Sequence, residues 1–238
     1  MSHMTPRARE AVLSSEYVLG NDTYLKQIPE LLDEKHVIES RMGKEVERAK
    51  RAMELAKEHR TCIISGGDAN VYGMASIVLE VLEREKAEIE IEIVPGISAL
   101  NACASLLGAP LTTDFAVISL SDLLTPWEVI ERRLDAAAYA DFVIVLFNPK
   151  SKNRSSNLKK AVEIIRKHRR EAPVGLVKNG MRMGEKVVIT HLEDIEEHDD
   201  FVDMRTTVIV GNSESRVWKR SKQDYIITPR GYHRKYTY

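Results

Sequence analysis

The sequence predicts an α/β fold built from two domains. Short β-branched runs alternate with longer amphipathic segments, and this alternation requires crossover connections and a largely parallel sheet. The runs Cys62–Ser65 and Phe142–Phe147 are almost continuously apolar, as expected for strands that helices cover on both faces. From Pro173 onward, strands follow one another with only one short acidic helix between them. The second half therefore contains a mixed sheet with antiparallel pairs.

In the N-terminal half, β-branched runs mark the strands and apolar residues at helical spacing mark the helices. The first helix has a clear start, because Thr5 offers a capping hydroxyl directly before Pro6. The expected strands are Tyr17–Leu19, His36–Glu39, Thr61–Ser65 and Ile89–Val94. The expected helices are Pro6–Leu13, Thr23–Leu32, Lys44–His59, Val71–Glu85 and Ser98–Leu106.

The same signals continue in the C-terminal half, where Thr125 and Glu128 predict a capping box around Pro126. The segment Leu107–Thr113 is the best linker candidate, so we predict an N-terminal α/β domain at 1–112 and a C-terminal mixed-sheet domain at 113–238. The expected strands are Phe115–Leu120, Phe142–Phe147, Val174–Val177, Lys186–Thr190, Thr206–Val210 and Tyr225–Ile227. The expected helices are Pro126–Ala137, Ser156–His168 and Leu192–Glu196.

Composition excludes several classes of protein. The chain has 238 residues, of which 43% are hydrophobic, so it can bury a large core and is not disordered. Its 35 basic and 36 acidic residues almost cancel, which argues against nucleic-acid and membrane-surface binders. The uncharged stretch Ile93–Leu111 is as long as a membrane span, but its prolines and polar residues favour a strand, a turn and a buried helix. Cys62 and Cys103 lack CxxC spacing and are expected to be buried thiols in a reducing cytosol.

Three turns after predicted strands carry residues that suit a ligand. They are Ser65–Gly73, Val94–Ala99 and Phe147–Arg154. The carboxyl ends of strands are where open α/β sheets bind ligands. The same residues also fit a purely structural role, in which Asp68 and Ser98 cap helices and the cations after Asn148 are solvated.

Familiar phosphate and metal motifs do not occur in the chain. There is no GxGxxG, GxxxxGK[ST], HExxH, CxxC or GxSxG pattern, and the seven histidines show no ligand spacing. We therefore expect no protein-bound metal. Turns whose backbone can approach a ligand closely, in a chain without a phosphate-binding loop, suit a ligand that is bound through its hydroxyl groups and neutral rings.

The ligand-type turns belong to a set of segments that resembles the tetrapyrrole methyltransferases over nearly the whole chain. Within that family the resemblance is to the precorrin-3B C17-methyltransferases, which act on cobalt-factor III in the anaerobic route. SLSDLLTPW followed by NPKSKNR is typical of this subfamily, whereas SGGD…YG and PGISA are shared more widely. The matching segments are Met4–Val12, Ser65–Ala75, Val94–Leu111, Ser119–Trp127, Asn148–Arg154, Val177–Arg182 and Thr206–Ser213.

The resemblance implies a cytoplasmic, homodimeric enzyme of cobalamin (vitamin B12) biosynthesis. It would transfer a methyl group from S-adenosyl-L-methionine to C17 of precorrin-3B or cobalt-factor III and contract the ring. The cofactor would lie in a cleft between the two domains. The implied cofactor-binding residues are Gly67, Asp68, Val71, Ser98, Ala99, Phe147, Asn148, Lys178, Asn179 and Thr207.

The substrate carries many acetate and propionate carboxylates, so cations should bind it, with arginine bidentate where geometry permits. No residue is assigned as a general acid or base. The expected substrate-binding residues are Arg41, Lys150, Lys152, Arg154 and Arg182.

The sequence departs from the family at its N-terminus. The family opens with a β-strand and a GxGPG loop ahead of the MTPRA helix, whereas only Met1-Ser2-His3 precede Met4 here. We therefore expect the first strand and its loop to be missing. The loss of a central strand would expose sheet edges and open the cofactor site.

Other functions remain open at this stage. Within enzymes, the alternatives are another tetrapyrrole C-methyltransferase or a diphthine-synthase-like methylating enzyme. Outside enzymes, the chain could be a non-catalytic tetrapyrrole-binding homologue. A nucleic-acid binder is a weaker alternative, because the basic stretch from Lys150 to Arg170 lacks interleaved aromatic residues.

Overall fold

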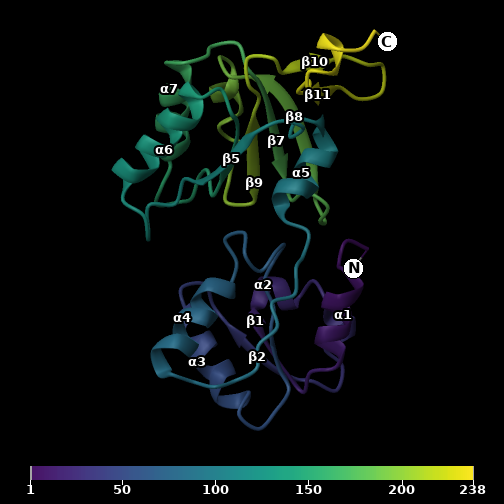
Figure 1. Cartoon of the computed structure of the whole chain (residues 1–238), viewed down its shortest axis with the longest axis vertical. Coiled ribbons are helices and arrows are strands. Elements are labelled where there is room, and N and C mark those ends of the chain that lie inside the picture. Colours follow the sequence, from purple (N-terminus) through teal and green to yellow (C-terminus); the bar gives the residue numbers. More distant parts are fainter. Residues whose placement is uncertain (1, 238) are drawn as a thin grey trace. The chain divides into compact units, whose positions relative to one another are not determined.

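The protein consists of two compact units, Met1–Ala99 and Leu100–Tyr238 (Figure 1). The computed structural model describes residues 2–237. The first unit ends thirteen residues before the predicted boundary at residue 112. The difference arises because α5 (Ala99–Leu107) and β4 (Gly108–Ala109) pack with later parts of the chain: β4 pairs with β11 (Tyr225–Ile227). Tertiary pairing thus overrides the turn-rich composition on which the prediction relied.

The first unit has a parallel sheet in the order β2-β1-β3. Its strands are β1 (Tyr17–Asn21), β2 (His36–Ser40) and β3 (Thr61–Ile63), and both pairings are parallel, as predicted. Val12, Val18, Leu25 and Leu31 form a buried cluster on the side of α1 (Pro6–Leu13). Its other helices are α2 (Asp22–Leu25), the 3-10 turn Pro29–Leu31, α3 (Glu45–Leu55) and α4 (Ala75–Glu85).

The second unit has a mixed five-stranded sheet in the order β5-β6-β9-β7-β8. The pair β5–β6 is parallel, and the remaining pairs are antiparallel, which confirms the predicted change of rhythm. The strands are β5 (Phe115–Ser119), β6 (Val143–Phe147), β7 (Pro173–Lys178), β8 (Lys186–His191) and β9 (Thr206–Val210). Most side chains of the three central strands, β6, β9 and β7, are buried.

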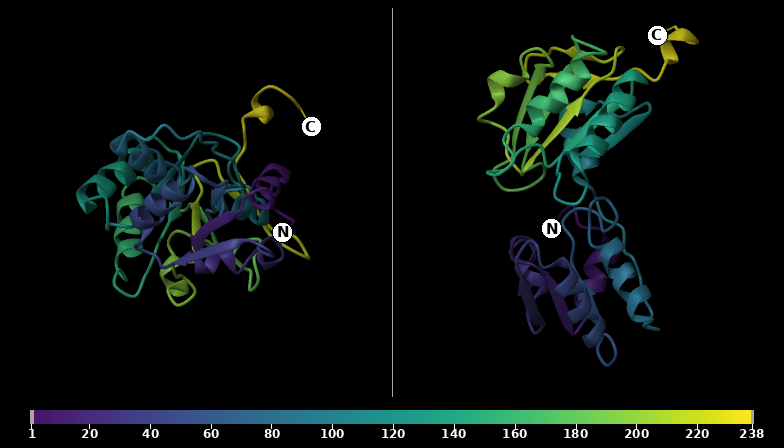
Figure 2. Two further views of the ribbon diagram at one scale, coloured as in Figure 1. Left: turned by 90° about the horizontal axis from the view of Figure 1, so that it is seen from below. Right: turned by 90° about the vertical axis from the view of Figure 1, so that its left-hand side faces the viewer.

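Helices cover both faces of this second sheet. The helices α6 (Trp127–Tyr139) and α7 (Asn157–Arg166) lie together on one face and share a core with Val174 and Leu176 of β7 (Figures 1 and 2). On the opposite face, a Cβ added to Gly175 would lie 2.2 Å from Leu107 of α5, so glycine allows this close approach. A small sheet, β10 (Arg216–Trp218)-β11-β4, and the 3-10 turns Ile195–His198 and Tyr232–Arg234 complete the unit.

Several predicted elements differ from the structure. The segment Ile89–Val94 is extended but forms no ladder within the described residues. The predicted helix Thr23–Leu32 is interrupted before Pro29, whose ring removes a backbone N–H and restricts the residue before it. The helix expected from Val71 begins only at Ala75. The strands β4 and β10 were not predicted, because each is too short to show a periodic pattern.

The two expected helix caps have different outcomes. Thr5 caps α1, since its hydroxyl accepts a hydrogen bond from the backbone N–H of Ala8 at 3.2 Å. The capping box at Thr125 is wrong, because Pro126 occupies the N-cap position of α6 and no side-chain hydrogen bond caps the helix.

No helix among residues 2–237 is long and apolar enough to cross a membrane. Both cysteines are free, and burial raises the pKa of the Cys62 thiol to about 11.

Candidate functional site

In the first unit, the Asp68 carboxylate ties two turns together. One oxygen accepts hydrogen bonds from the backbone N–H groups of Asn70 and Val71, at 2.8 and 3.1 Å. The other oxygen accepts from the N–H of Gly96 at 2.9 Å. The turn after β3 is thereby held against the turn that leads into α5. Asp68 thus connects two of the three turns that the sequence singled out, instead of capping a helix that starts at Val71.

The backbones of these two turns approach each other closely. Gly67 has a positive φ of 83°, and a Cβ placed on it would lie 3.5–3.6 Å from backbone atoms of Ile97, Ser98 and Ala99. A Cβ on Gly96 would lie only 2.1 Å from the carbonyl oxygen of Gly67. Both glycines are therefore required by the geometry. Five predicted cofactor-binding residues are brought together in this way: Gly67, Asp68, Val71, Ser98 and Ala99.

The hydrogen bonds around Asp68 determine its charge state. The N–H of Gly96 is the largest influence that lowers the pKa of the Asp68 carboxyl below its ordinary value of 3.8, with the N–H groups of Asn70 and Val71 adding to it. Partial burial acts in the opposite direction and is outweighed. The site thus presents a fixed carboxylate at neutral pH.

We expect Asp68→Asn to lower the melting temperature at neutral pH. The amide oxygen still accepts from Asn70 and Val71, but the amide N–H₂ faces the N–H of Gly96. A hydrogen bond to a charged group contributes about 1.5–3 kcal/mol. Because the folded-state pKa is lowered, this stabilisation is present above pH 3.8 and is lost as the pH falls through the folded-state value. The measurement is the melting temperature of both proteins from neutral pH to below pH 3.8, where the difference should shrink. A difference that is constant with pH would contradict the assignment.

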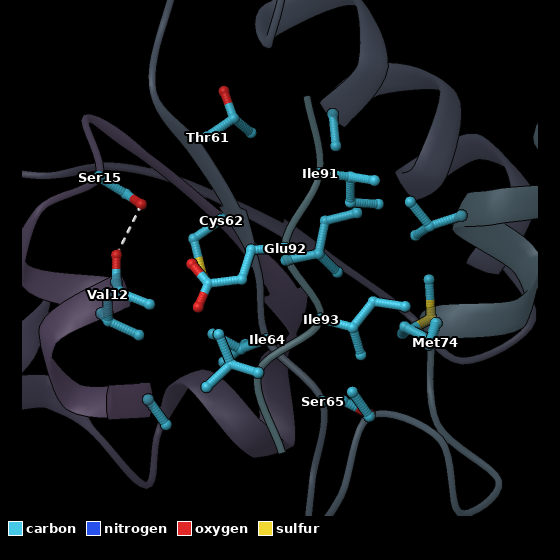
Figure 3. A pocket seen from close by; sticks show the side chains of 18 of the residues that line it. Val12, Ser15, Thr61, Cys62, Ile64, Ser65, Met74, Ile91, Glu92 and Ile93 are labelled. Atoms are coloured by element: carbon cyan, nitrogen blue, oxygen red, sulfur yellow. Dashed lines mark hydrogen bonds between the residues drawn. The ribbon is translucent and has the colours of Figure 1, made fainter. Parts of the chain in front are cut away.

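A cavity of about 660 Å³ lies beside these turns within the first unit. It separates residues 61–65 from residues 89–96 and reaches Gly67 and Gly96 (Figure 3). Ile91 and Ile93, with 42% and 37% of their surface exposed, project on the Met74 side, and Glu92 projects to the side of Cys62 (Figure 3). This alternation is that of a β-strand.

The two walls of the cavity run in the same direction and meet where Gly96 binds Asp68 (Figure 3). Arg7 of α1 holds the second wall through a two-pronged ion pair with Glu92. Neither the outer edge of β3 nor residues 89–94 pairs with a strand in the described part of the chain. An unpaired sheet edge therefore lies directly beside the predicted cofactor-binding turns.

In the second unit, the predicted residues gather at one edge of the sheet. Ser119 pairs with Phe147 at the ends of β5 and β6, and Lys178 pairs with Thr206 where β7 ends and β9 begins. Thr207 is 5% exposed; it lies on β9, between β6 and β7, and pairs with Val177 of β7. This edge also carries the remaining predicted cofactor-binding residues: Phe147, Asn148, Lys178, Asn179 and Thr207.

Two asparagines at this edge have strained backbones. Asn148 and Asn179 have positive φ values of 52° and 51°, a conformation that is uncommon outside glycine. Hydrogen bonds hold both side chains: Asn148 donates to the hydroxyl of Ser119 at 2.9 Å, and Asn179 donates to the carbonyl of Gly184 at 3.2 Å. Such strain tends to collect at ligand sites.

The predicted substrate-binding cations differ in their surroundings. Lys150 forms an ion pair with Asp199, and Arg154, whose side chain is 11% exposed, reaches the carbonyl of Leu120 at 3.4 Å. Lys152 and Arg182 are exposed in neighbouring loops of the second unit, whereas Arg41 is exposed in the first unit after β2. The structure thus groups four of the five cations in one unit. Their role in binding substrate stays a prediction.

Sequence reasoning missed an apolar set at the same edge. Leu123, Leu124 and Met183 are 78%, 98% and 99% exposed. The two leucines belong to the SLSDLLTPW segment, which marked a subfamily but received no role. The signal available in the sequence was a pair of leucines between a strand end and a helix start, where polar residues are usual.

Residues 2–237 contain no group of three or more histidine, cysteine, aspartate or glutamate residues that could hold a metal ion. The two groups of predicted residues present backbone amides, one fixed carboxylate and asparagine side chains. Such groups can bind hydroxyls, amines and ring nitrogens.

Comparisons of the sequence and of the structure relate this chain to known proteins. The profile of the Tetrapyrrole (Corrin/Porphyrin) Methylases matches residues 1–196. A cobalt-factor III methyltransferase of Priestia megaterium is 48% identical over 99% of this chain, which spans only 44% of that longer protein. A probable cobalt-factor III C(17)-methyltransferase of Salmonella typhimurium is 44% identical, with 96% of this chain and 93% of that protein covered. The crystal structure of the methyltransferase CobJ aligns with a TM-score of 0.86 at 33% identity, covering 94% of this chain and 93% of that one.

The profile covers most of the chain, and these relatives are well above 30% identical over almost its whole length. Both units of the structure take part in the similarity to CobJ, since 94% of the chain is aligned. This chain belongs to the tetrapyrrole methylase family.

Proposed function

We propose that this protein is an S-adenosyl-L-methionine-dependent methyltransferase of cobalamin biosynthesis. It methylates C17 of cobalt-factor III or precorrin-3B and contracts the macrocycle. The observation that carries the proposal is its 44% identity to the Salmonella typhimurium protein along 93% of that protein. A Sinorhizobium protein named precorrin-3B C(17)-methyltransferase is 39% identical over 96% of this chain, which supports the second substrate.

The turns of the first unit fit the cofactor. S-adenosyl-L-methionine presents ribose hydroxyls, an adenine edge and an amino acid end, and it has no phosphate. The close approach of the two turns leaves no room for a side chain on Gly96, the positive φ of Gly67 favours glycine there, and Asp68 fixes the two turns as one surface. In the second unit, Phe147, Asn148, Lys178, Asn179 and Thr207 form the complementary group of cofactor-binding residues.

The protein's contribution to the reaction is orientation. When bound, the cofactor supplies an electrophilic methyl group on its sulfonium, and the electron-rich macrocycle supplies the carbon nucleophile. Asp68 and the strained Asn148 and Asn179 hold their loops in one arrangement before ligands arrive. Correct orientation of reacting groups can lower a barrier by up to ~7–11 kcal/mol.

The substrate carboxylates bind the cations at the edge of the second unit. Arg154, Lys150, Lys152 and Arg182 lie in the loops after β6 and β7, and Arg41, in the first unit, is a further candidate for the same role. Charge-assisted hydrogen bonds to carboxylates are the strong ones, and arginine forms them in pairs.

Methyl transfer to defined substrates tests the proposal. The purified protein is incubated with S-adenosyl-L-methionine and, separately, with cobalt-factor III, precorrin-3B and uroporphyrinogen III, and products are analysed by mass spectrometry. We expect the mass of one added methyl group on either of the first two substrates. Methylation of uroporphyrinogen III alone would assign the protein to another tetrapyrrole C-methyltransferase.

A second candidate function is tetrapyrrole binding without catalysis. The cavity next to Gly67 and Gly96 favours it, since an open wall lowers the precision of the cofactor site. Calorimetry with S-adenosylhomocysteine distinguishes the two. Tetrapyrrole binding without any heat from S-adenosylhomocysteine would support the non-catalytic alternative.

We also propose that the protein is a homodimer, as two-fold assemblies are the commonest soluble oligomers. Light scattering at micromolar concentration measures this directly. A monomer mass would reject it.

A further inference from the structure

Three large apolar side chains stand out at the carboxyl edge of the second unit. Leu123 and Leu124 are consecutive in the loop after β5, and Met183 lies in the loop between β7 and β8. Their exposed fractions are 78%, 98% and 99%. Single exposed apolar residues are common on protein surfaces. Three large apolar side chains that are this exposed, all at the edge where the ligand-type loops gather, indicate a surface that contacts something apolar.

The leucine loop stands on a rigid base. The carbonyl of Leu120, which is completely buried, accepts a hydrogen bond from the Asn157 side chain at 2.8 Å. The N–H of Leu120 donates to the carbonyl of Phe147 at 2.8 Å, and the N–H of Ser121 donates to the Ser119 hydroxyl at 3.2 Å. The loop is therefore anchored to β5, β6 and α7, and only its tip is free to contact a ligand.

Met183 is presented by an equally well-defined turn. Asn179 and Met181 have positive φ values, and the N–H of Met181 donates to the Glu185 carboxylate at 2.7 Å. The Asn179 side chain closes the turn by donating to the carbonyl of Gly184 at 3.2 Å. Met183 projects from this closed turn into solvent.

The two apolar points flank the predicted site. β5 and β7 are separated by β6 and β9, so three strand spacings of ~4.8 Å put the ends of these two strands about 14 Å apart, and the two loops leave the sheet from there. Between them lie Phe147, Asn148 and Thr207 at the ends of β6 and β9. Arg154 and Lys178 stand along the same edge, 3.8 Å from Asp122 and 3.3 Å from Asp203 respectively. An edge with apolar side chains in two of its loops and cations alongside suits a flat macrocycle of four pyrrole rings with carboxylates on its rim.

We propose that Leu123 and Leu124 at one end and Met183 at the other hold the apolar ring system of the tetrapyrrole against this edge. The proposal rests on the proposed function and adds the residues that position the macrocycle. The occupant is the substrate and not a second copy of the chain, because the cations at this edge complement the substrate's carboxylates.

The test compares the double variant Leu123→Ser/Leu124→Ser and the single variant Met183→Ser with the wild-type protein. Leu79→Ser is the matched control, since Leu79 is an exposed leucine on α4 in the first unit. For each protein the dissociation constant for cobalt-factor III is measured by absorbance titration, together with KM, kcat, S-adenosylhomocysteine affinity, melting temperature and mass in light scattering.

We expect the double variant to bind cobalt-factor III about 10–100-fold more weakly and Met183→Ser about 10-fold more weakly, because apolar area is lost from each contact. KM should rise in parallel, while kcat, S-adenosylhomocysteine affinity and melting temperature stay near those of wild type. Leu124→Met, which keeps the apolar volume, should bind within about 3-fold of wild type. Leu79→Ser should behave as wild type.

Three results would overturn the proposal. Unchanged cobalt-factor III binding with a halved mass would make the leucines an interface between copies. A lowered melting temperature in the double variant would make them structural. Equal losses in the double variant and in Leu79→Ser would make the effect unspecific. Failure of the proposed function itself is seen separately, as wild-type protein that neither binds nor methylates any tetrapyrrole.

Discussion

Replacement of Gly96 by alanine should remove most of the affinity for the cofactor. The added Cβ would lie 2.1 Å from the carbonyl oxygen of Gly67, a distance that real contacts do not reach, and this oxygen belongs to the backbone and cannot swing aside as a flexible side chain could. The two turns must therefore move apart. That movement breaks the hydrogen bond from the N–H of Gly96 to Asp68 and destroys the paired surface. Overpacking of this kind costs about 1–3 kcal/mol of stability, and the misplaced site should bind S-adenosylhomocysteine ~100-fold more weakly.

Gly43→Ala is the control for general destabilisation, at a glycine with open space around it. Gly43 has the same positive φ as Gly67, 83°, but nothing lies within 4 Å of the Cβ that alanine would add. Its cost is the backbone strain of a left-handed alanine alone, of order 1 kcal/mol. Calorimetry with S-adenosylhomocysteine and thermal melts compare the two variants. If both lose cofactor affinity equally, general destabilisation and not the paired turns would explain the result.

Replacement of Arg154 by alanine should weaken tetrapyrrole binding strongly while S-adenosylhomocysteine affinity stays within about 3-fold of wild type. Arg154 reaches the carbonyl of Leu120 at 3.4 Å and lies 3.8 Å from Asp122, so its guanidinium sits at the base of the leucine loop. Charge-assisted hydrogen bonds are worth roughly 1.5–3 kcal/mol, which corresponds to a ~10–100-fold loss. Lys150→Ala should have a smaller effect, because Asp199 already neutralises Lys150.

Arg166→Ala provides the control for the loss of a partly buried arginine. Arg166 lies in the last turn of α7 and pairs with Glu196, away from the carboxyl edge. It should lower the melting temperature without changing either affinity. Tetrapyrrole titration and calorimetry are run on all three variants. If Arg154→Ala and Lys150→Ala both bind the tetrapyrrole as tightly as the wild-type protein, their loop is a solvated surface without a role in substrate binding.

Much of the architecture could be predicted from patterns within the chain. Continuous apolar runs located β6 and most of β3, and the change of rhythm after Pro173 predicted the antiparallel pairs around β9. These features depend on local residue spacing, and local spacing is readable without coordinates. Segments whose state depends on a neighbour were harder. Ile89–Val94 has every property of a strand, but a ladder also needs a partner, and the described residues supply none.

The order of residues also predicted the candidate site, because glycines, Asp68 and Asn148 follow strands whose ends bind ligands in such sheets. Their interactions were decided only by the folded chain. Asp68 looked like a helix cap, yet it accepts hydrogen bonds from Gly96, 28 residues later. Lys150 looked like a free cation and is paired with Asp199, 49 residues later. The exposure of Leu124 and Met183 is likewise a property of packing, because apolar residues are buried or displayed according to what the rest of the chain brings next to them.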